Sequence, residues 1–265
     1  MRRIRLIIEY NGTNYVGWQT QKNGIAVQQI ISDELKKLCG EDIALHGSGR
    51  TDSGVHALAQ VAHFDTSCRI PGDKFQYALN VGLPADIRIR HSEETDADFH
   101  ARFDVKRKSY RYAVLNRHHS SAFTPNNALH VYFPLRLDKM KEAAELFVGE
   151  HDFLAFKATG TKVENTVRTI YRSEWSADGD MLYYDVTGSG FMYNMVRIMV
   201  GVMLDIGLGR MDKSCIESAF ESRQRKELGV TAPAKGLYLA RVQYADFDTD
   251  DFIKPTGGFP PFLRL

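Results

Sequence analysis

The sequence has few cysteines, and their placement suits no shared role. Cys39, Cys68 and Cys215 are far apart in the chain and odd in number. A disulfide framework shows an even number of regularly spaced cysteines, and a structural zinc site shows pairs that are a few residues apart. The chain shows neither signature, and its cysteine usage is typical of a reduced protein. We therefore expect a cytoplasmic location.

Long apolar segments are also scarce. The sequence begins MRRIRLIIEYNG, with basic residues before apolar ones, but the apolar part is too short and too interrupted for a signal peptide. The longer apolar stretch 191–208 contains Asn194, Arg197 and Asp205, and no second hydrophobic stretch accompanies it. A buried core helix is the expected interpretation of this stretch, and no association with a membrane is predicted.

Motifs for cofactors and metals are missing as well. The sequence GSG at 47–49 lacks the third glycine of a dinucleotide fingerprint, and no Gly-Lys-Ser/Thr forms a phosphate loop. His56 and His63 are seven residues apart, which places them on opposite faces of a strand that would run through 55–64. We therefore predict neither a metal site nor a cofactor.

The net charge is close to zero, but the charges are unevenly distributed. The 265 residues are 43% hydrophobic and 25% charged, with a net charge of +1, which is an ordinary globular composition. The segments 93–98 and 246–251 carry only acidic charges, whereas 99–118 is basic and interleaved with aromatic residues. Such a segment is typical of RNA contacts, although a solvated strand with its flanks fits the pattern equally well. Its basic side chains are Arg102, Lys106, Arg107, Lys108, Arg111 and Arg117.

The hydrophobic pattern predicts an α+β protein with two similar halves, each a sheet with helices on one face. Strands are expected at 3–10, 55–64, 87–90, 109–115, 167–175, 181–187 and 236–244. Helices are expected at 27–38, 75–81, 137–148, 191–208 and 213–221. The order of elements restarts near residue 105. We predict an N-terminal half over 1–104, a C-terminal half over 105–245 and a tail over 246–265.

The stretch GSGRTDSGVH, residues 47–56, surrounds one charged pair with three glycines. Glycine accepts backbone conformations that are closed to other residues, so this loop is able to aim the Asp52 carboxylate into a cleft. The neighbouring cation of Arg50 would lower the pKa of Asp52 and keep it ionised, which suits a nucleophile. A plain Asp-Ser-Gly turn with a surface ion pair is the alternative, and the loop alone favours it.

Arg197 lies in a segment that is apolar on nearly every face, where a guanidinium needs a carboxylate or several carbonyl groups as partners. The residues three and four positions away on either side include no acid. The side chain therefore either pairs with an acid from elsewhere in the chain, for which Asp52 is the natural candidate, or extends to the surface.

Tyr110 and Tyr112 alternate with Arg111, which places both rings on one face of a strand and the guanidinium on the other. Packing in the core would explain both rings. The functional alternative is a ring that stacks against a base and offers its hydroxyl group for proton transfer. The pattern alone does not choose between them.

Five blocks of the sequence form a recognisable set. They are GSGRTDSGVHALAQVAHF (47–64), FHARF (99–103), KSYRY (108–112), FMYNMVRIMVG (191–201) and AKGLYL (234–239). Together they resemble the TruA family of tRNA pseudouridine synthases, in the family's order, and the Arg-Thr-Asp block is highly specific. The similarity extends from about residue 3 to residue 244, and the segment 254–263, KPTGGFPPFL, resembles the family's C-terminal tail. The resemblance implies the pseudouridine synthase fold, in which two similar α/β halves with mainly antiparallel sheets are joined around a central cleft.

This resemblance also implies roles for individual residues. Asp52 corresponds to the family's nucleophile, and Tyr110 to the tyrosine that contacts the target base. Arg197 corresponds to the basic residue that pairs with the catalytic aspartate, and Arg50 to the arginine that occupies the space of the flipped base. Substrate binding would involve Tyr110 together with the basic residues Arg102, Lys106, Arg107, Lys108 and Arg111.

The reaction implied by the resemblance is the isomerisation of uridine to pseudouridine at positions 38, 39 and 40 of the anticodon stem-loop of tRNA. A homodimer would carry it out without a cofactor or metal. Asp52 would attack the anomeric carbon of the ribose or C6 of the base, or the reaction would pass through a glycal, and the sequence leaves these routes open. Two other functions are considered: an RNA-binding protein or tRNA folding chaperone on the same fold, and a sugar-cleaving hydrolase with a second catalytic carboxylate.

Overall fold

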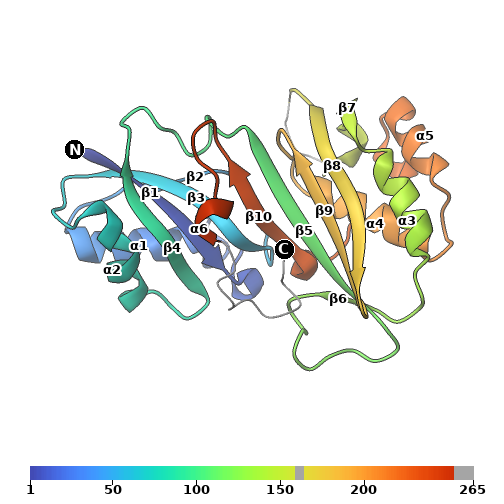
Figure 1. The fold of residues 1–265 in the computed structure, drawn as a ribbon, viewed down its shortest axis with the longest axis horizontal. Coiled ribbons are helices and arrows are strands. Elements are labelled where there is room, and N and C mark those ends of the chain that lie inside the picture. Colours follow the sequence, from blue (N-terminus) through green and yellow to red (C-terminus); the bar gives the residue numbers. More distant parts are fainter. Residues whose placement is uncertain (159–163, 254–265) are drawn as a thin grey trace. The chain divides into compact units, whose positions relative to one another are not determined.

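The structure, a computed structural model, describes residues 1–158 and 164–253. The chain forms two compact units: the first contains Met1–Lys106 and Tyr238–Leu265, and the second contains Arg107–Leu237. Each unit has its own strands and helices (Figure 1). Because most strand pairs are antiparallel and helices pack on the sheets, the predicted α+β class with mainly antiparallel sheets is confirmed.

The strands of the first unit are β1 (Arg2–Tyr10), β2 (His46–Gly47), β3 (His56–Thr66), β4 (Ile87–Thr95) and β10 (Leu237–Gln243). β1 lies between β3 and β4 and is antiparallel to both. β10 joins the other edge of β3 in parallel, with Tyr238 opposite His56, and β2 pairs with β3 beside His63. Since β1 and β3 are buried along most of their length, they form the centre of this unit's core.

The helices of the first unit are α1 (Val27–Cys39), α2 (Phe75–Gly82) and the short α6 (Asp250–Ile253). α1 buries Val27, Ile31 and Leu35, which recur at helical spacing, and it ends at Gly40, whose φ of 71° is left-handed. α1 and α2 contact each other, and α2 packs on β4 (Figure 1). The periodic apolar residues therefore fix these helices against the sheet, as the sequence predicts.

The strands of the second unit are β5 (Arg107–Asn116), β6 (Leu129–Val131), β7 (Gly149–Asp152), β8 (Val167–Asp178) and β9 (Met181–Gly188). The order β5-β9-β8-β7 is antiparallel throughout, and β6 pairs with β5 in parallel. The strands predicted at 167–175 and 181–187 form a hairpin, because β8 and β9 are joined at a turn where Gly179 has a φ of 57°.

The helices of the second unit are α3 (Leu137–Glu145), α4 (Met195–Gly207) and α5 (Ser214–Ser222). α3 packs on both β8 and α4 (Figure 1). α4 is buried on nearly every face, so the apolar stretch predicted to be a core helix is one. Within residues 1–158 and 164–253, no helix is long and apolar enough to cross a membrane.

Several element boundaries differ from the sequence prediction. α4 begins at Met195 rather than at residue 191, because Asn194 has a left-handed φ of 61° that ends the preceding turn. The helix predicted over 137–148 ends at Glu145, and Gly149 opens β7 instead of only closing the helix. Apolar periodicity does not show either change of backbone direction.

The domain division also differs. The second half was predicted over 105–245, and the division near residue 105 lies close to the structural one at Lys106 and Arg107. The last strand, however, belongs with the first unit, because β10 pairs with β3 there. Residues of the predicted tail that the structure describes also return to the first unit, where α6 contacts β4. The resemblance of 254–263 to the family's tail lies outside the described residues.

The two acidic segments pair with arginines of the first unit. In the segment 93–98, Glu93 accepts from Arg5 at 2.6 Å across β4 and β1. In the segment 246–251, the Asp248 carboxylate accepts from the Arg241 Nε at 2.8 Å. These segments therefore contribute ion pairs on the sheet of the first unit.

Candidate active site

Asp52 lies in the loop between β2 and β3, and the residues beside it are fixed in the core of the first unit. Thr51 is buried, and its hydroxyl oxygen lies 2.8 Å from the hydroxyl of Tyr10. Its carbonyl oxygen accepts from the N–H of Trp18 at 3.3 Å. The Asp52 carbonyl oxygen accepts from the N–H of Val55 at 3.1 Å, which closes the Asp-Ser-Gly turn. Asp52 itself is half-buried, so the turn is anchored on one side while the carboxylate lies near the surface of the unit.

Two glycines outside the loop allow neighbouring backbone to approach it closely. Gly17 has a φ of 103°, and a Cβ there would lie 2.3 Å from the Thr51 carbonyl oxygen. At Gly12 a Cβ would lie 2.0 Å from the Val55 carbonyl oxygen. Both distances are shorter than any tolerable contact, so the loop is positioned by backbone that only glycine permits. The sequence prediction missed the roles of Gly12 and Gly17.

The start of the loop is tied to β3 by a buried pair of polar side chains. The Ser48 hydroxyl donates to the Gln60 Oε1 at 2.6 Å, and the Gln60 Nε2 donates to the Gly49 carbonyl oxygen at 2.9 Å. Both side chains are fully buried. Because buried polar groups are costly unless they are hydrogen-bonded, this pair fixes the register of the loop on β3. Periodicity alone gives no signal for such a pair.

Arg50 lies on the exposed side of the same loop. Its Nε donates to the Gln19 Oε1 at 3.3 Å, a long hydrogen bond that leaves the guanidinium near solvent. An exposed arginine two residues from a half-buried carboxylate suits the predicted role of filling the space of a flipped base. That role stays a prediction.

In the second unit, the two tyrosines of β5 have different environments. Tyr112 is fully buried and donates to the Pro233 carbonyl oxygen at 2.7 Å, and burial raises the pKa of its hydroxyl well above the ordinary value. Tyr110 is half-buried and meets the Phe191 ring edge to face, with 5.2 Å between the centroids. Tyr112 is therefore a core residue, whereas Tyr110 keeps the partial exposure that contact with a base requires.

Arg197 lies in the first turn of α4 and is half-buried. Its Nε donates to the Ala232 carbonyl oxygen at 2.8 Å, and its Nη1 donates to the Asn194 Oδ1 at 2.7 Å. The side chain is thus held by hydrogen bonds within its own unit and does not simply extend into solvent. Asp52 belongs to the first unit and Arg197 to the second, and the ion pair between them stays a prediction.

The basic segment divides into exposed and buried members. Arg102, Lys106 and Arg107 are exposed, and Lys108 is half-buried. The Arg107 guanidinium carbon lies 4.3 Å from the centroid of the Tyr171 ring, an arrangement that suits a flat, positively charged contact surface. These exposed cations are the stronger candidates for phosphate contacts.

Arg111, also predicted to bind substrate, is only 8% exposed. Its Nε and Nη2 donate to the two carboxylate oxygens of Asp185, both at 2.7 Å. This fork-to-fork geometry satisfies a cation in the interior and accounts for Arg111 structurally. Its part in substrate binding stays a prediction, weaker than that of the exposed cations.

Three histidines of the first unit, His46, His63 and His100 of the FHARF turn, lie close together. The His63 ring lies 5.1 Å from that of His46 and 4.7 Å from that of His100. The Nδ1 of His63 accepts from the N–H of Ala101 at 3.1 Å, and the Nδ1 of His100 accepts from the N–H of Arg102 at 3.1 Å. Burial, aided by the charges of His100, Arg3 and His46, lowers the pKa of His63 to about 4. In the part of the chain that the structure describes, no group of His, Cys, Asp or Glu has the arrangement of a metal site.

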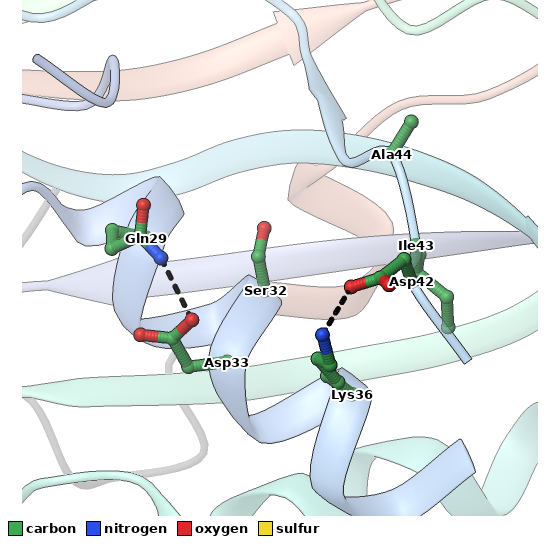
Figure 2. A pocket seen from close by; sticks show the side chains of 7 residues that line it. All are labelled: Gln29, Ser32, Asp33, Lys36, Asp42, Ile43 and Ala44. Carbon is green, nitrogen blue, oxygen red and sulfur yellow. Dashed lines mark hydrogen bonds and ion pairs between the residues drawn. The ribbon is translucent and has the colours of Figure 1, made fainter. Parts of the chain in front are cut away.

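A hollow of about 390 Å³ lies elsewhere in the first unit, between the outer side of α1 and the segment 42–44 (Figure 2). Lys36 and Asp42 form an ion pair at 2.6 Å across it, and the Gln29 Nε2 donates to the Asp33 Oδ1 at 2.7 Å. The predicted site residues do not line this hollow. Because these polar side chains bond to one another, we assign the hollow no functional role.

Comparison with known proteins identifies the family. The family model for tRNA pseudouridine synthase matches residues 6–104 and 143–245. The tRNA pseudouridine synthase A of Ruminiclostridium cellulolyticum is 51% identical over 92% of this chain and 100% of its own length. That of Acetivibrio thermocellus is 48% identical, with the same coverage of 92% and 100%.

A solved structure shows a more distant likeness. The crystal structure of a Cbf5-Nop10-Gar1 complex matches 76% of this chain and 45% of that chain, at 14% identity and a TM-score of 0.35. Since the family model covers most of the chain, including Asp52 and Arg197, and full-length relatives are about half identical to it, the chain belongs to the tRNA pseudouridine synthase family.

Proposed function

We propose that this protein isomerises uridine to pseudouridine at positions 38, 39 and 40 in the anticodon stem-loop of tRNA, with Asp52 as the nucleophile. Membership of the tRNA pseudouridine synthase family supports the reaction. The main structural support for this site is the conformation of the Asp52 loop. Gly12 and Gly17 fix its backbone, and Asp52 is half-buried. A fixed carboxylate near the surface is what attack on an extruded nucleotide requires.

The reaction leaves the elemental composition of the uridine unchanged. The bond between N1 and the anomeric carbon breaks, the base rotates, C5 joins the same carbon, C5 loses its proton and N1 gains one. Asp52 attacks either the anomeric carbon or C6 of the base, or the route passes through a glycal. Because the isomerisation is redox-neutral and needs no external group, no cofactor or metal is part of the proposal.

The other residues support this chemistry. Arg197 pairs with the Asp52 carboxylate and keeps it ionised. Tyr110, half-buried against Phe191, contacts the target base and accepts the C5 proton. Arg50 occupies the space that the flipped base leaves, which offsets part of an unstacking cost of a few kcal/mol.

The substrate is held through its phosphates. The exposed Arg102, Lys106 and Arg107 are the main contacts, and Lys108 and Arg111 contribute from β5. We further propose that the protein works as a homodimer in the cytoplasm, on the resemblance to its family and on its cysteine usage.

Release of tritium from a tRNA transcript labelled at uridine C5 tests the proposal. The wild-type protein is expected to release tritium from positions 38–40, and Asp52→Asn to lower the rate by a factor of about 1,000 or more, because a nucleophile is lost. Asp178→Asn, at an exposed turn, removes the same charge far from the loop in sequence and should leave the rate unchanged.

Two outcomes would favour other functions. Wild-type protein that binds tRNA but releases no more tritium than Asp52→Asn would indicate an RNA-binding protein or a tRNA folding chaperone. Free uracil among the products would indicate a sugar-cleaving hydrolase.

A further inference from the structure

We propose that Asn194 is a positioning residue, which fixes the orientation of the Arg197 guanidinium. This inference rests on the proposed function, in which Arg197 pairs with Asp52. It assigns to Asn194 a task that its place at the start of a helix does not by itself suggest.

Asn194 does not use its side chain as a helix cap normally does. It precedes α4, and its carbonyl oxygen accepts the N–H of Ile198 at 2.9 Å to begin the helix. An asparagine at this position usually accepts a backbone N–H of the first turn, but here the side chain makes no such bond. The Oδ1 accepts the Arg197 Nη1 at 2.7 Å instead. The side chain therefore serves the arginine rather than the helix.

The backbone of Asn194 is strained, and this limits the residue types that the position accepts. With a φ of 61° and a ψ of 1°, it lies in the left-handed region, which glycine and asparagine enter more readily than other residues. Arg223 is the other described residue besides glycine with a positive φ. Backbone strain of this kind persists where the surrounding structure requires it, commonly at functional sites.

Among the residues that enter this conformation most readily, asparagine offers a neutral side-chain oxygen as the acceptor. Glycine would keep the backbone and lose the acceptor. Aspartate would keep an acceptor but place a carboxylate against Arg197 within the same unit, in competition with Asp52 for the cation. A neutral oxygen orients the guanidinium without neutralising it, and this combination is the physical argument for a positioning role.

A second hydrogen-bond acceptor also holds the Arg197 guanidinium. The Ala232 carbonyl oxygen accepts the Arg197 Nε at 2.8 Å, and the Ala232 N–H donates to the Arg197 carbonyl oxygen at 3.0 Å. The segment 230–232 lies directly on α4, because a Cβ at Gly201 would lie 1.9 Å from the Val230 carbonyl oxygen. Since guanidinium is planar, two acceptors at Nε and Nη1 set the direction in which its remaining N–H groups point.

The same turn also reaches Tyr110. Phe191, three residues before Asn194, meets the Tyr110 ring, and the Tyr193 carbonyl oxygen accepts the N–H of Ala158 at 3.2 Å. Both contacts hold the residues that lead into Asn194. Two predicted catalytic side chains of this unit depend on one short segment, 191–197.

Asn194→Gly separates positioning from folding. Glycine relieves the left-handed strain, and this gain offsets the lost hydrogen bond and the greater freedom of the unfolded chain. The melting temperature should therefore change little, while the acceptor for Arg197 is lost. We expect kcat for tritium release, normalised to folded protein, to fall about 10- to 100-fold with tRNA Kd within about 2-fold. Asn194→Asp should lower kcat at least as far. Arg223→Gly, which relieves the same strain at the end of α5, should leave kcat unchanged.

An activity-independent readout accompanies the kinetics. Hydrogen exchange at the Arg197 Nε, measured by NMR, should be slow in the wild-type protein and faster in Asn194→Gly, because a guanidinium with one anchor reorients. Wild-type kcat in Asn194→Gly, a loss that appears only in Kd, or unchanged exchange would each overturn the inference. If the wild-type protein releases no tritium, the proposed function fails, and the exchange measurement still decides whether Asn194 holds Arg197.

Discussion

The two units hold their predicted catalytic residues by different physical means. In the first unit the Asp52 loop is positioned by backbone contacts, with Gly17 against the Thr51 carbonyl oxygen. In the second unit Arg197 is oriented by a side-chain amide and one carbonyl group. Backbone contacts leave no room for substitution, whereas a side-chain anchor is replaced at the cost of one hydrogen bond. The first unit should therefore be the less tolerant of change near its catalytic residue.

Gly17→Ala tests this difference most severely. The added Cβ would collide with the Thr51 carbonyl oxygen and force the Asp52 loop to move, on a backbone that already has a φ of 103°. A displacement of about 1 Å lowers turnover on the order of 100-fold, and we expect at least that loss in the tritium-release assay. The melting temperature should fall as well, because the buried Thr51 and Trp18 contacts are disturbed.

Gly40→Ala is the matched control for Gly17→Ala. Gly40 ends α1 with a φ of 71°, but a Cβ there would meet nothing within 4 Å. This variant should lose only about 1 kcal/mol of stability through backbone strain and keep its turnover per folded molecule. Equal losses of turnover in the two variants would show that strain, rather than the collision with the loop, governs activity.

Two arginines of the second unit differ in whether their partners are charged or neutral. Arg111→Ala leaves the Asp185 carboxylate buried without its fork-to-fork partner and should cost about 3 kcal/mol of unfolding free energy, measured in urea. Arg197→Ala should instead lower turnover more than stability, because its anchors within the unit are neutral oxygens. If Arg197→Ala left turnover unchanged, Arg197 would have no part in the mechanism.

Much of the fold was predictable from local patterns. Apolar periodicity and the glycines at the ends of elements predict β1, α1 and the hairpin of β8 and β9. Both signals lie within the segment that they predict. The partner of β10 was not predictable, because a strand's neighbours are chosen by long-range packing rather than by its own residues. The start of α4 was missed because the residues before Asn194 continue the apolar pattern although the backbone turns there.

The candidate site was predictable to a smaller extent. Asp52 and Arg197 were proposed from a glycine-rich loop, an arginine in an apolar helix and a family resemblance. The residues that hold them in place were not predicted. Gly17 is distant in sequence from the loop, and an arginine in an apolar helix suggests an acidic partner rather than the amide of Asn194. The partner of Arg111 lies 74 residues away, and charge patterns along a chain do not identify such pairs.

Acid should destabilise the first unit through His63. Its pKa is lowered from 6.5 to about 4, mainly by burial, so the folded protein disfavours the proton that the unfolded chain accepts. Stability is therefore complete above pH 6.5 and falls as the pH drops toward 4, by roughly 2 kcal/mol between pH 7 and pH 5. Urea unfolding at both pH values measures this loss. His63→Gln, which cannot take up a proton, should lose correspondingly less between the two pH values, whereas His119→Gln, at an exposed position of the second unit, should behave as the wild-type protein does. If His63→Gln lost as much stability as the wild-type protein, the acid sensitivity would arise from other groups. His63 would then not distinguish the two units.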